Sequence, residues 1–259
     1  MKHSLTTYGK NGVLKIKGNP QETMLYLRSK PIQYSWYAEV GSTWRYHIAQ
    51  GLDKQAINIH AGMEEQLKNG IANEGEFLGI CEYFNRFFTY GTYEYGHFEL
   101  PVDLGWIEIP EQEAYKSFDY YGGLLSISPT QNSIDKAIVR DYKVQILKGA
   151  RPAIVLLHME NSWMFYLLDG HHKFMAYKLA QVQPRAVIIT KLGNDYPSTE
   201  ETITLAKAMD CVNPTYLKWM KCEKERIEAY KNKILDLEAE FERINFSQKR
   251  DIASSKNGS

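Results

Sequence analysis

The residues with the clearest potential for chemistry form one short run, Asp169-Gly170-His171-His172-Lys173. The apolar residues 163–168 before it predict a strand, and the residues from His171 to about Gln181 predict a helix. The first backbone N–H groups of a helix have no partner within the helix, and the helix dipole makes that end electropositive. Because Gly170 permits a tight turn and the close approach of an anion, this turn suits a phosphate group.

The side chains of the same run add charge and hydrogen-bonding groups to the turn. His171, His172 and Lys173 can contact phosphate oxygens. Asp169, at the end of the predicted strand, can hold a divalent cation or orient a histidine. The run also has an ordinary structural interpretation, in which Asp169 caps the helix and the histidines lie half-exposed. Since a motif this short recurs by chance, the elements around it must decide between the two.

Strand and helix patterns alternate on both sides of the turn. Residues 124–127 predict a short strand that Ser128-Pro129 closes, and Asn132-Ser133 can cap a helix from Ile134 to Leu147. Further strands are predicted over 153–157, over 163–168 after a hairpin turn at 159–162, and over 186–190. The predicted order is therefore strand, helix, strand, strand, helix, strand.

This order and its motifs resemble the ParB/sulfiredoxin superfamily from about Leu124 to Leu192, a little over a quarter of the chain. The similarity rests on Ile127-Ser128-Pro129, on the strand that follows Gly149-Ala150-Arg151-Pro152, and on the Asp169–Lys173 turn with its following helix. It implies a small mixed-sheet module within an α+β protein. The form of the turn is most similar to the branch that contains free-serine kinases, which transfer a phosphoryl group from a nucleotide to serine.

The resemblance implies a site for a nucleoside di- or triphosphate with Mg²⁺. It gives Asp169 a part in positioning the metal or the acceptor hydroxyl, and it counts His172 among the catalytic candidates. It makes His171, His172 and Lys173 contacts of the phosphates, with the Gly170 backbone as their cradle. Two further residues of the module are candidates for phosphate contact, Gln131 and Arg151.

The chain departs from the kinase pattern where a catalytic base is expected. Those kinases have a glutamate just after the first strand, whereas this chain reads Pro129-Thr130-Gln131. Glutamine cannot take a proton, so Asp135 or Asp119 would have to replace it. Phosphotransfer to a hydroxyl of a small molecule or a protein is the leading hypothesis. The second is a catalytically weak nucleotide-binding switch whose flanking regions engage a protein partner.

Other chemistries of the superfamily fit these residues less well. Sulfiredoxins have a cysteine in the turn, which this chain lacks, so that activity is excluded. ParB proteins bind cytidine triphosphate through an arginine-rich turn and then carry a helix-turn-helix. Here the turn has only Lys173, so DNA partitioning is disfavoured. A ParB-like nuclease stays open as a third hypothesis, and with it a nucleic-acid partner.

Composition indicates an ordinary globular protein. Of 259 residues, 44% are hydrophobic and 24% are charged, and no apolar run is long enough to span a membrane. No secretory signal is visible, and the three cysteines lack the spacing of a metal site, so a cytoplasmic location without membrane contact is expected. Residues 117–192 carry 9 Lys and Arg against 5 Asp and Glu, which makes this segment suited to an anionic ligand.

Four regions are predicted along the chain. They are an aromatic-rich α/β accessory region at 1–116, the nucleotide-binding module at 117–196, a helical extension at 197–250 and a disordered tail at 251–259. The accessory region contains no catalytic motif. Its predicted elements are strands over 13–17 and 23–27 and helices over 56–68 and 76–88. Cys81, His158 and the aromatic residues at 90–98 are expected to pack rather than to form sites.

Overall fold

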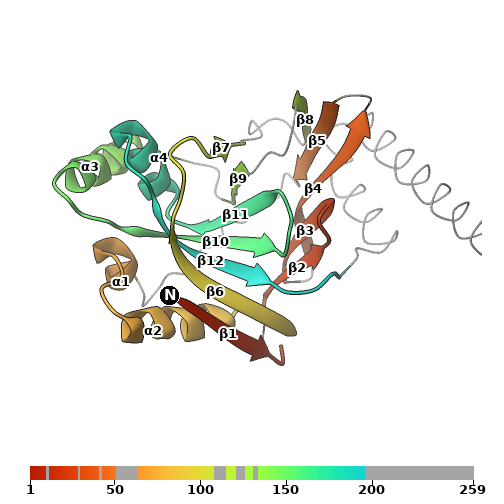
Figure 1. Cartoon of the computed structure of the whole chain (residues 1–259), viewed down its shortest axis with the longest axis horizontal. Coiled ribbons are helices and arrows are strands. Elements are labelled where there is room, and N and C mark those ends of the chain that lie inside the picture. The colour runs from red at the N-terminus through yellow and green to blue at the C-terminus, as the bar shows by residue number, and fades with distance from the viewer. Residues whose placement is uncertain are drawn as a thin grey trace, which may run out of the picture. The chain divides into compact units, whose positions relative to one another are not determined.

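Two β-sheets and four helices make up the α+β fold of the described residues (Figure 1). In this part of the chain the larger sheet is mixed and has seven strands in the order β1-β6-β12-β10-β11-β9-β7. Their bounds are β1 Lys2–Thr7, β6 Gly91–Glu99, β7 Gly105–Trp106, β9 Ser126–Pro129, β10 Ala153–Met159, β11 Met164–Asp169 and β12 Arg185–Lys191. The smaller sheet, within the same residues, has the order β2-β3-β4-β5-β8, with β2 Leu14–Gly18, β3 Glu22–Leu27, β4 Lys30–Val40, β5 Thr43–Gln50 and β8 Tyr115–Tyr120.

The computed structural model describes residues 1–9, 12–28, 30–40, 43–50, 64–107, 115–120, 126–130 and 134–195. All of them belong to one compact unit, Met1–Val212. Gln131, the predicted cap at Asn132-Ser133, and the predicted C-terminal helices and tail lie outside these residues. Among the helices that are described, none is long and apolar enough to cross a membrane.

The predicted order of elements around the Asp169–Lys173 turn is confirmed. Strand β9 pairs parallel with β11, β11 pairs antiparallel with β10, and β10 pairs parallel with β12. Helix α3 (Lys136–Leu147) follows β9, and helix α4 (His171–Ala180) follows β11. The predicted hairpin turn is present, because the amide of Ser162 donates to the carbonyl of Met159 at 3.0 Å.

Helix α3 begins two residues later than its apolar pattern predicts. Asp135 is the N-cap, and its carboxylate accepts hydrogen bonds from the amides of Ala137 at 2.7 Å and Ile138 at 3.4 Å. Asp is a strong N-cap because its side chain satisfies amides that the helix leaves unpaired. Ile138 is 40% exposed, and the buried face of α3 carries Val139 and Ile146.

Strands from the predicted accessory region extend the same sheet. β6 pairs antiparallel with β12, and β1 pairs antiparallel with β6 at the sheet edge. β8 runs across the predicted boundary between residues 116 and 117. The accessory region and the predicted module therefore share one sheet. Neither β1 nor β6 was predicted, and local patterns do not show which strands lie side by side.

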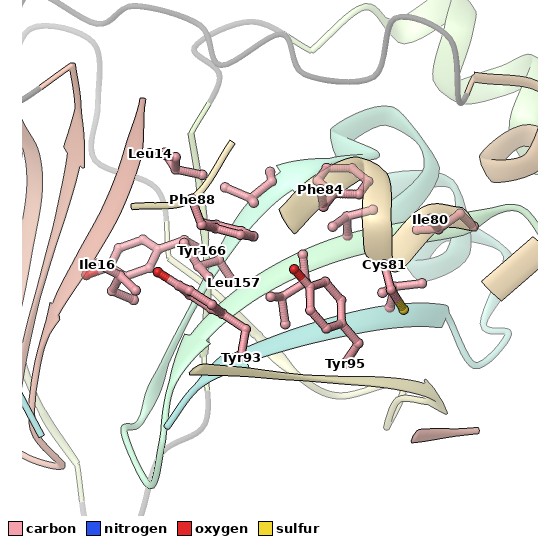
Figure 2. Close-up of a cluster of buried hydrophobic side chains, with 14 of the residues drawn as sticks. Leu14, Ile16, Ile80, Cys81, Phe84, Phe88, Tyr93, Tyr95, Leu157 and Tyr166 are labelled. Carbon is pink, nitrogen blue, oxygen red and sulfur yellow. The ribbon is translucent and has the colours of Figure 1, made fainter. Parts of the chain in front are cut away.

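Helix α2 (Glu74–Asn85) covers one face of the larger sheet and forms its core (Figure 2). It buries Phe77, Ile80, Cys81 and Phe84. Figure 2 shows Tyr93 and Tyr95 of β6 pointing toward this layer of side chains, and the Phe88 and Tyr93 rings stack with centroids 4.6 Å apart. The predicted packing role of Cys81 is confirmed, and burial raises the pKa of its thiol to about 12.

Four elements correspond to the accessory-region predictions. Helix α1 (Glu64–Asn69) overlaps the predicted helix 56–68 and ends one residue beyond it, and the first part of that prediction is outside the described residues. The predicted strands at 13–17 and 23–27 correspond to β2 and β3. Helix α2 starts two residues before its predicted position, because the side chain of Asn73 accepts a hydrogen bond from the amide of Glu76 at 3.0 Å.

A buried polar cluster joins the smaller sheet to the larger one. The Tyr166 hydroxyl on β11 lies 2.8 Å from Thr23 Oγ1 and 3.2 Å from Ser35 Oγ, on β3 and β4. Thr23 and Ser35 also bond to each other at 2.7 Å, and Gln33 of β4 donates to Ser128 of β9. Buried polar groups are tolerated when they are hydrogen-bonded in this way. The cluster therefore fixes the register of one sheet against the other.

Candidate functional site

The turn between β11 and α4 requires glycine. Gly170 has a φ of 95°, in the left-handed region, and a Cβ at this position would lie 2.7 Å from Ile154 Cγ2. Gly170 is the N-cap of α4, and no side chain of the described residues caps the helix there. The phosphate cradle that the sequence predicts at the first amides of α4 stays a prediction.

Asp169 and Lys173 form a buried ion pair across the first turn of α4. Lys173 Nζ lies 2.9 Å from Asp169 Oδ2 and also donates to the carbonyl of Ala153 at 3.1 Å. The two side chains are only 11% and 7% exposed. The ammonium group is therefore directed at the start of β10 and neutralises the carboxylate, and its part in phosphate binding stays a prediction.

His171 is buried beneath the chain that follows β9. Its Nε2 accepts a hydrogen bond from the amide of Thr130 at 3.1 Å. Burial lowers the pKa of His171 to about 4, and nearby His172 also lowers it, while Asp169 acts in the opposite direction. The imidazole is consequently neutral at pH 7, with its proton assigned to Nδ1 because Nε2 is an acceptor.

His172 joins the start of α4 to the start of α3. Its Nε2 accepts a hydrogen bond from the amide of Asp135 at 3.0 Å. Burial lowers the pKa of His172, against the opposing charges of Asp135 and Asp169. Figure 1 shows α3 and α4 lying next to each other. The structure thus brings Asp135 together with the predicted site residues of the turn, which are Asp169, Gly170, His171, His172 and Lys173.

Arg151 is not brought to this place. Its guanidinium donates to the carbonyls of Ile146 at 3.0 Å and Ala150 at 2.8 Å, at the C-terminal end of α3. Asp135 caps the opposite end of that helix, about 16 Å away at 1.5 Å per residue. Gln131 and the side chain of Asp119 lie outside what the structure describes.

The chain matches no family model, no curated protein and no solved structure. The assignment to the ParB/sulfiredoxin superfamily is therefore a proposal that rests on the residues of the turn and on the order of the elements.

The residues of the turn do not form a closed metal site. Within the described ranges, no group of three or more His, Cys, Asp and Glu side chains is arranged to hold a metal ion. Mg²⁺ commonly binds through one or two carboxylates together with phosphates and water. Asp169 is paired with Lys173 here, and its part as a ligand of Mg²⁺ stays a prediction.

The sequence did not predict a groove that lies beside the turn. It lies between α3 and α4, has a volume of about 540 Å³, and is lined by Trp106, Ile134, Lys136, Val139, Arg140, Lys143, Met175 and Leu179. Three of these residues are basic and occupy positions i, i+4 and i+7 of α3, which places them on one side of the helix. That spacing is visible in the sequence, but it indicates a groove only once α4 is known to lie alongside.

Proposed function

We propose that this protein is a ParB/sulfiredoxin-like nucleotide-binding protein that transfers a phosphoryl group to a hydroxyl of a small molecule or a protein. One observation supports this proposal above the others: the amino-terminal ends of α3 and α4 are held together by the 3.0 Å hydrogen bond from the Asp135 amide to His172. Each helix end carries a partial positive charge, and the two together favour a polyphosphate. Lys136, in the first turn of α3, adds a full positive charge.

The residues of the turn have separate parts in this proposal. The backbone from Gly170 onward holds the phosphates, and the Nδ1–H of neutral His172 donates to a phosphate oxygen. Mg²⁺ enters with the nucleotide and takes Asp169 as a ligand, while Lys173 limits the repulsion between that carboxylate and the phosphates. Phosphoryl transfer depends mostly on positioning and on charge stabilisation. Asp135 lies beside His172 and is the candidate to accept the proton of the acceptor hydroxyl.

A specific observation favours the second candidate, a nucleotide-binding switch with weak catalysis. Asp135 is occupied as a helix cap, and His171 and His172 accept hydrogen bonds from backbone amides. Both histidines therefore join α4 to the chain between β9 and α3. A phosphate that changed these contacts would move the start of α3, which is the kind of coupling that a switch requires.

The nucleotide site is tested by thermal-shift and calorimetric titrations with ATP, ADP, CTP and GTP, each with and without Mg²⁺. A ligand at about 100 times its dissociation constant should add about 2.7 kcal/mol of apparent stability. We expect one or more nucleotides to bind more tightly with Mg²⁺, and Mg²⁺ alone to have no measurable effect. Absence of a shift with every nucleotide would contradict the proposal.

Two substitutions test the turn. Asp169→Asn and His172→Ala should each weaken nucleotide binding about tenfold or more, since each removes a group that contacts phosphate or its metal. Lys178→Ala, on α4 beyond the first turn, is the matched control and should bind normally. Unchanged affinity in both test variants, with the fold intact by circular dichroism, would sink the assignment of this turn.

Asp135→Asn separates the two candidate functions. Asn is as good an N-cap as Asp, so α3 should keep its stability, but Asn cannot accept a proton. If the protein is a phosphotransferase, nucleotide turnover with hydroxyl acceptors should fall while nucleotide affinity is kept. If the wild-type protein binds nucleotide without turnover, the switch is supported. Cleavage of DNA or RNA in the same assay would instead support the nuclease hypothesis.

A further inference from the structure

The groove between α3 and α4 has two chemically different sides. Lys136, Arg140 and Lys143 line it from α3, and Met175 and Leu179 line it from α4. None of the three basic residues forms an ion pair or a side-chain hydrogen bond within the described part of the chain. Among the residues that the structure describes, no ion pair competes with a ligand for these charges.

The apolar side of the groove is unusually open to solvent. Leu179 is 57% exposed, although it lies next to the partly buried Met175. Trp106 closes one part of the groove, and its ring stacks on Phe174 with centroids 5.3 Å apart. Phe174 is fully buried, so the tryptophan is held against a rigid support. Such a wall gains free energy when a hydrophobic group covers it.

The volume of the groove points to a small molecule. At about 540 Å³ it falls within the range of about 300–1,000 Å³ that is common for small-molecule sites. Sites of this kind combine apolar walls with a few placed polar groups, as this groove does. An inorganic anion would leave the apolar wall exposed, and an uncharged hydrophobic molecule would leave the three cations without a partner.

We propose that this groove binds a small amphipathic organic anion, with an aromatic or acyl body against Trp106, Met175 and Leu179 and its acidic group near Arg140. The site is formed by the first two turns of α3 and by Met175 and Leu179 of α4, and it uses none of the hydrogen bonds of the Gly170 turn. Lys136 also belongs to the proposed phosphate site, but Arg140 and the apolar wall do not, so either site can fail without the other.

A matched pair of fluorescent probes tests this assignment on the full chain. 8-Anilinonaphthalene-1-sulfonate is an aromatic anion, and N-phenyl-1-naphthylamine has the same aromatic body without the charge. We expect the sulfonate to bind saturably and about tenfold or more tightly than the uncharged probe, because the acidic group pairs with the cations. Equal affinity of the two probes, or no saturable binding of the sulfonate, would overturn the proposal.

Variants then locate the bound probe. Arg140→Glu should weaken sulfonate binding about tenfold and leave the uncharged probe unaffected, whereas Leu179→Gln should weaken both. Lys148→Glu is the control, since Lys148 caps the same helix but does not line the groove. The unfolding temperature of each variant shows that the fold is kept. An equal loss with Lys148→Glu, or no loss with Arg140→Glu, would place the probe elsewhere and refute the site.

Competition defines the class of ligand. Octanoate and octyl phosphate should both displace the sulfonate, whereas octanol and inorganic phosphate at the same concentration should not. Displacement by octanol or by inorganic phosphate alone would show that one half of the groove is sufficient, which would contradict an amphipathic ligand. A nucleotide that competes as well as octyl phosphate would show that the groove and the turn are one site, against the independence proposed here.

Discussion

At the scale of single residues, the two histidines of the turn have a structural use that their sequence does not reveal. Each accepts a hydrogen bond at Nε2 from a backbone amide of the chain that leads into α3. An imidazole can accept at Nε2 only when that nitrogen is unprotonated. The attachment of the β9–α3 connection to the turn therefore depends on neutral histidine.

This dependence predicts a loss of stability in mild acid. The pKa of His171 is about 4 in the folded protein, below its ordinary value of 6.5. The stability that neutral His171 contributes is fully present above pH 6.5 and is lost as the pH falls toward 4. In this range the unfolded chain binds a proton at this histidine, whereas the folded chain does not. The loss is about 2 kcal/mol at pH 5 and about 3 kcal/mol at pH 4, and urea unfolding at pH 7.5, 6, 5 and 4 measures it.

His171→Gln is the control for this prediction. Glutamine can still accept a hydrogen bond from the Thr130 amide, but it does not titrate. The variant should therefore lose less stability than wild type between pH 6.5 and 5. His172, whose pKa is also lowered, contributes in the same direction in both proteins. If both proteins lose stability equally, the acid sensitivity arises elsewhere.

The Asp169–Lys173 pair leads to a second prediction at this scale. Lys173→Met leaves the buried Asp169 carboxylate without its cation and should destabilise the protein by about 3 kcal/mol. Adding Asp169→Asn to Lys173→Met should recover part of this loss, because the remaining charge is removed. The free energies of unfolding of the two single variants and the double variant form the necessary cycle. Additive effects would contradict a direct interaction.

At the scale of elements, the sequence predicted the helices and strands around the turn but not the way in which they start. The apolar spacing of 134–146 indicated a helix. The helix begins only after Asp135, because the Asp135 side chain caps it through its own hydrogen bonds. Arg151 was a candidate for phosphate contact, but its guanidinium donates to the carbonyls of Ile146 and Ala150. Whether a side chain forms hydrogen bonds with nearby or with distant groups depends on three-dimensional positions, which a sequence pattern does not contain.

A comparison of two glycines tests how little space the turn leaves for a side chain. Gly170 and Gly149 have nearly the same φ, 95° and 101°, but only at Gly170 would a Cβ collide with a neighbour, Ile154. Gly149→Ala should therefore cost about 1 kcal/mol for the left-handed backbone alone. Gly170→Ala should cost about 1–3 kcal/mol more, since the core must shift. Equal losses in the free energy of unfolding would show that the turn has room for a side chain.

At the scale of the whole described unit, the sequence predicted the strands of the module but not their neighbours from the first hundred residues. Val187 and Ile189 of β12 lie opposite His97 and Tyr95 of β6, a pairing across roughly 90 residues of chain. Aromatic residues at 90–98 were expected to pack, and Tyr93 and Tyr95 do, while Tyr90 is exposed. The strand β6 that they form was not predicted, and no local signal could specify β12 as its partner.

The hydroxyl cluster between the two sheets yields a prediction that belongs to this scale. Tyr166→Phe removes one hydroxyl that contacts Thr23 and Ser35, and it should cost about 1–2 kcal/mol. Amide hydrogen exchange should become faster in β3 and β4 as well as in β11. Tyr95→Phe, which loses only a contact to Asn85, is the control and should leave β3 and β4 protected. Unchanged exchange in the smaller sheet would show that the sheets are stabilised independently.

The strand order also determines which hydrogen bonds between strands can form while the protein is being synthesised. β6 lies between β1 and β12, so its hydrogen bonds on one side must wait until Lys191 has been synthesised. At about 5–20 residues per second, the roughly 90 intervening residues take on the order of 5 to 20 seconds to appear. During that interval β6, with its tyrosines, can pair only with β1, and its other edge is open on the nascent chain. A strand edge left open in this way can pair with other chains, so Gly91–Glu99 is a segment at risk of aggregation until β12 has been synthesised.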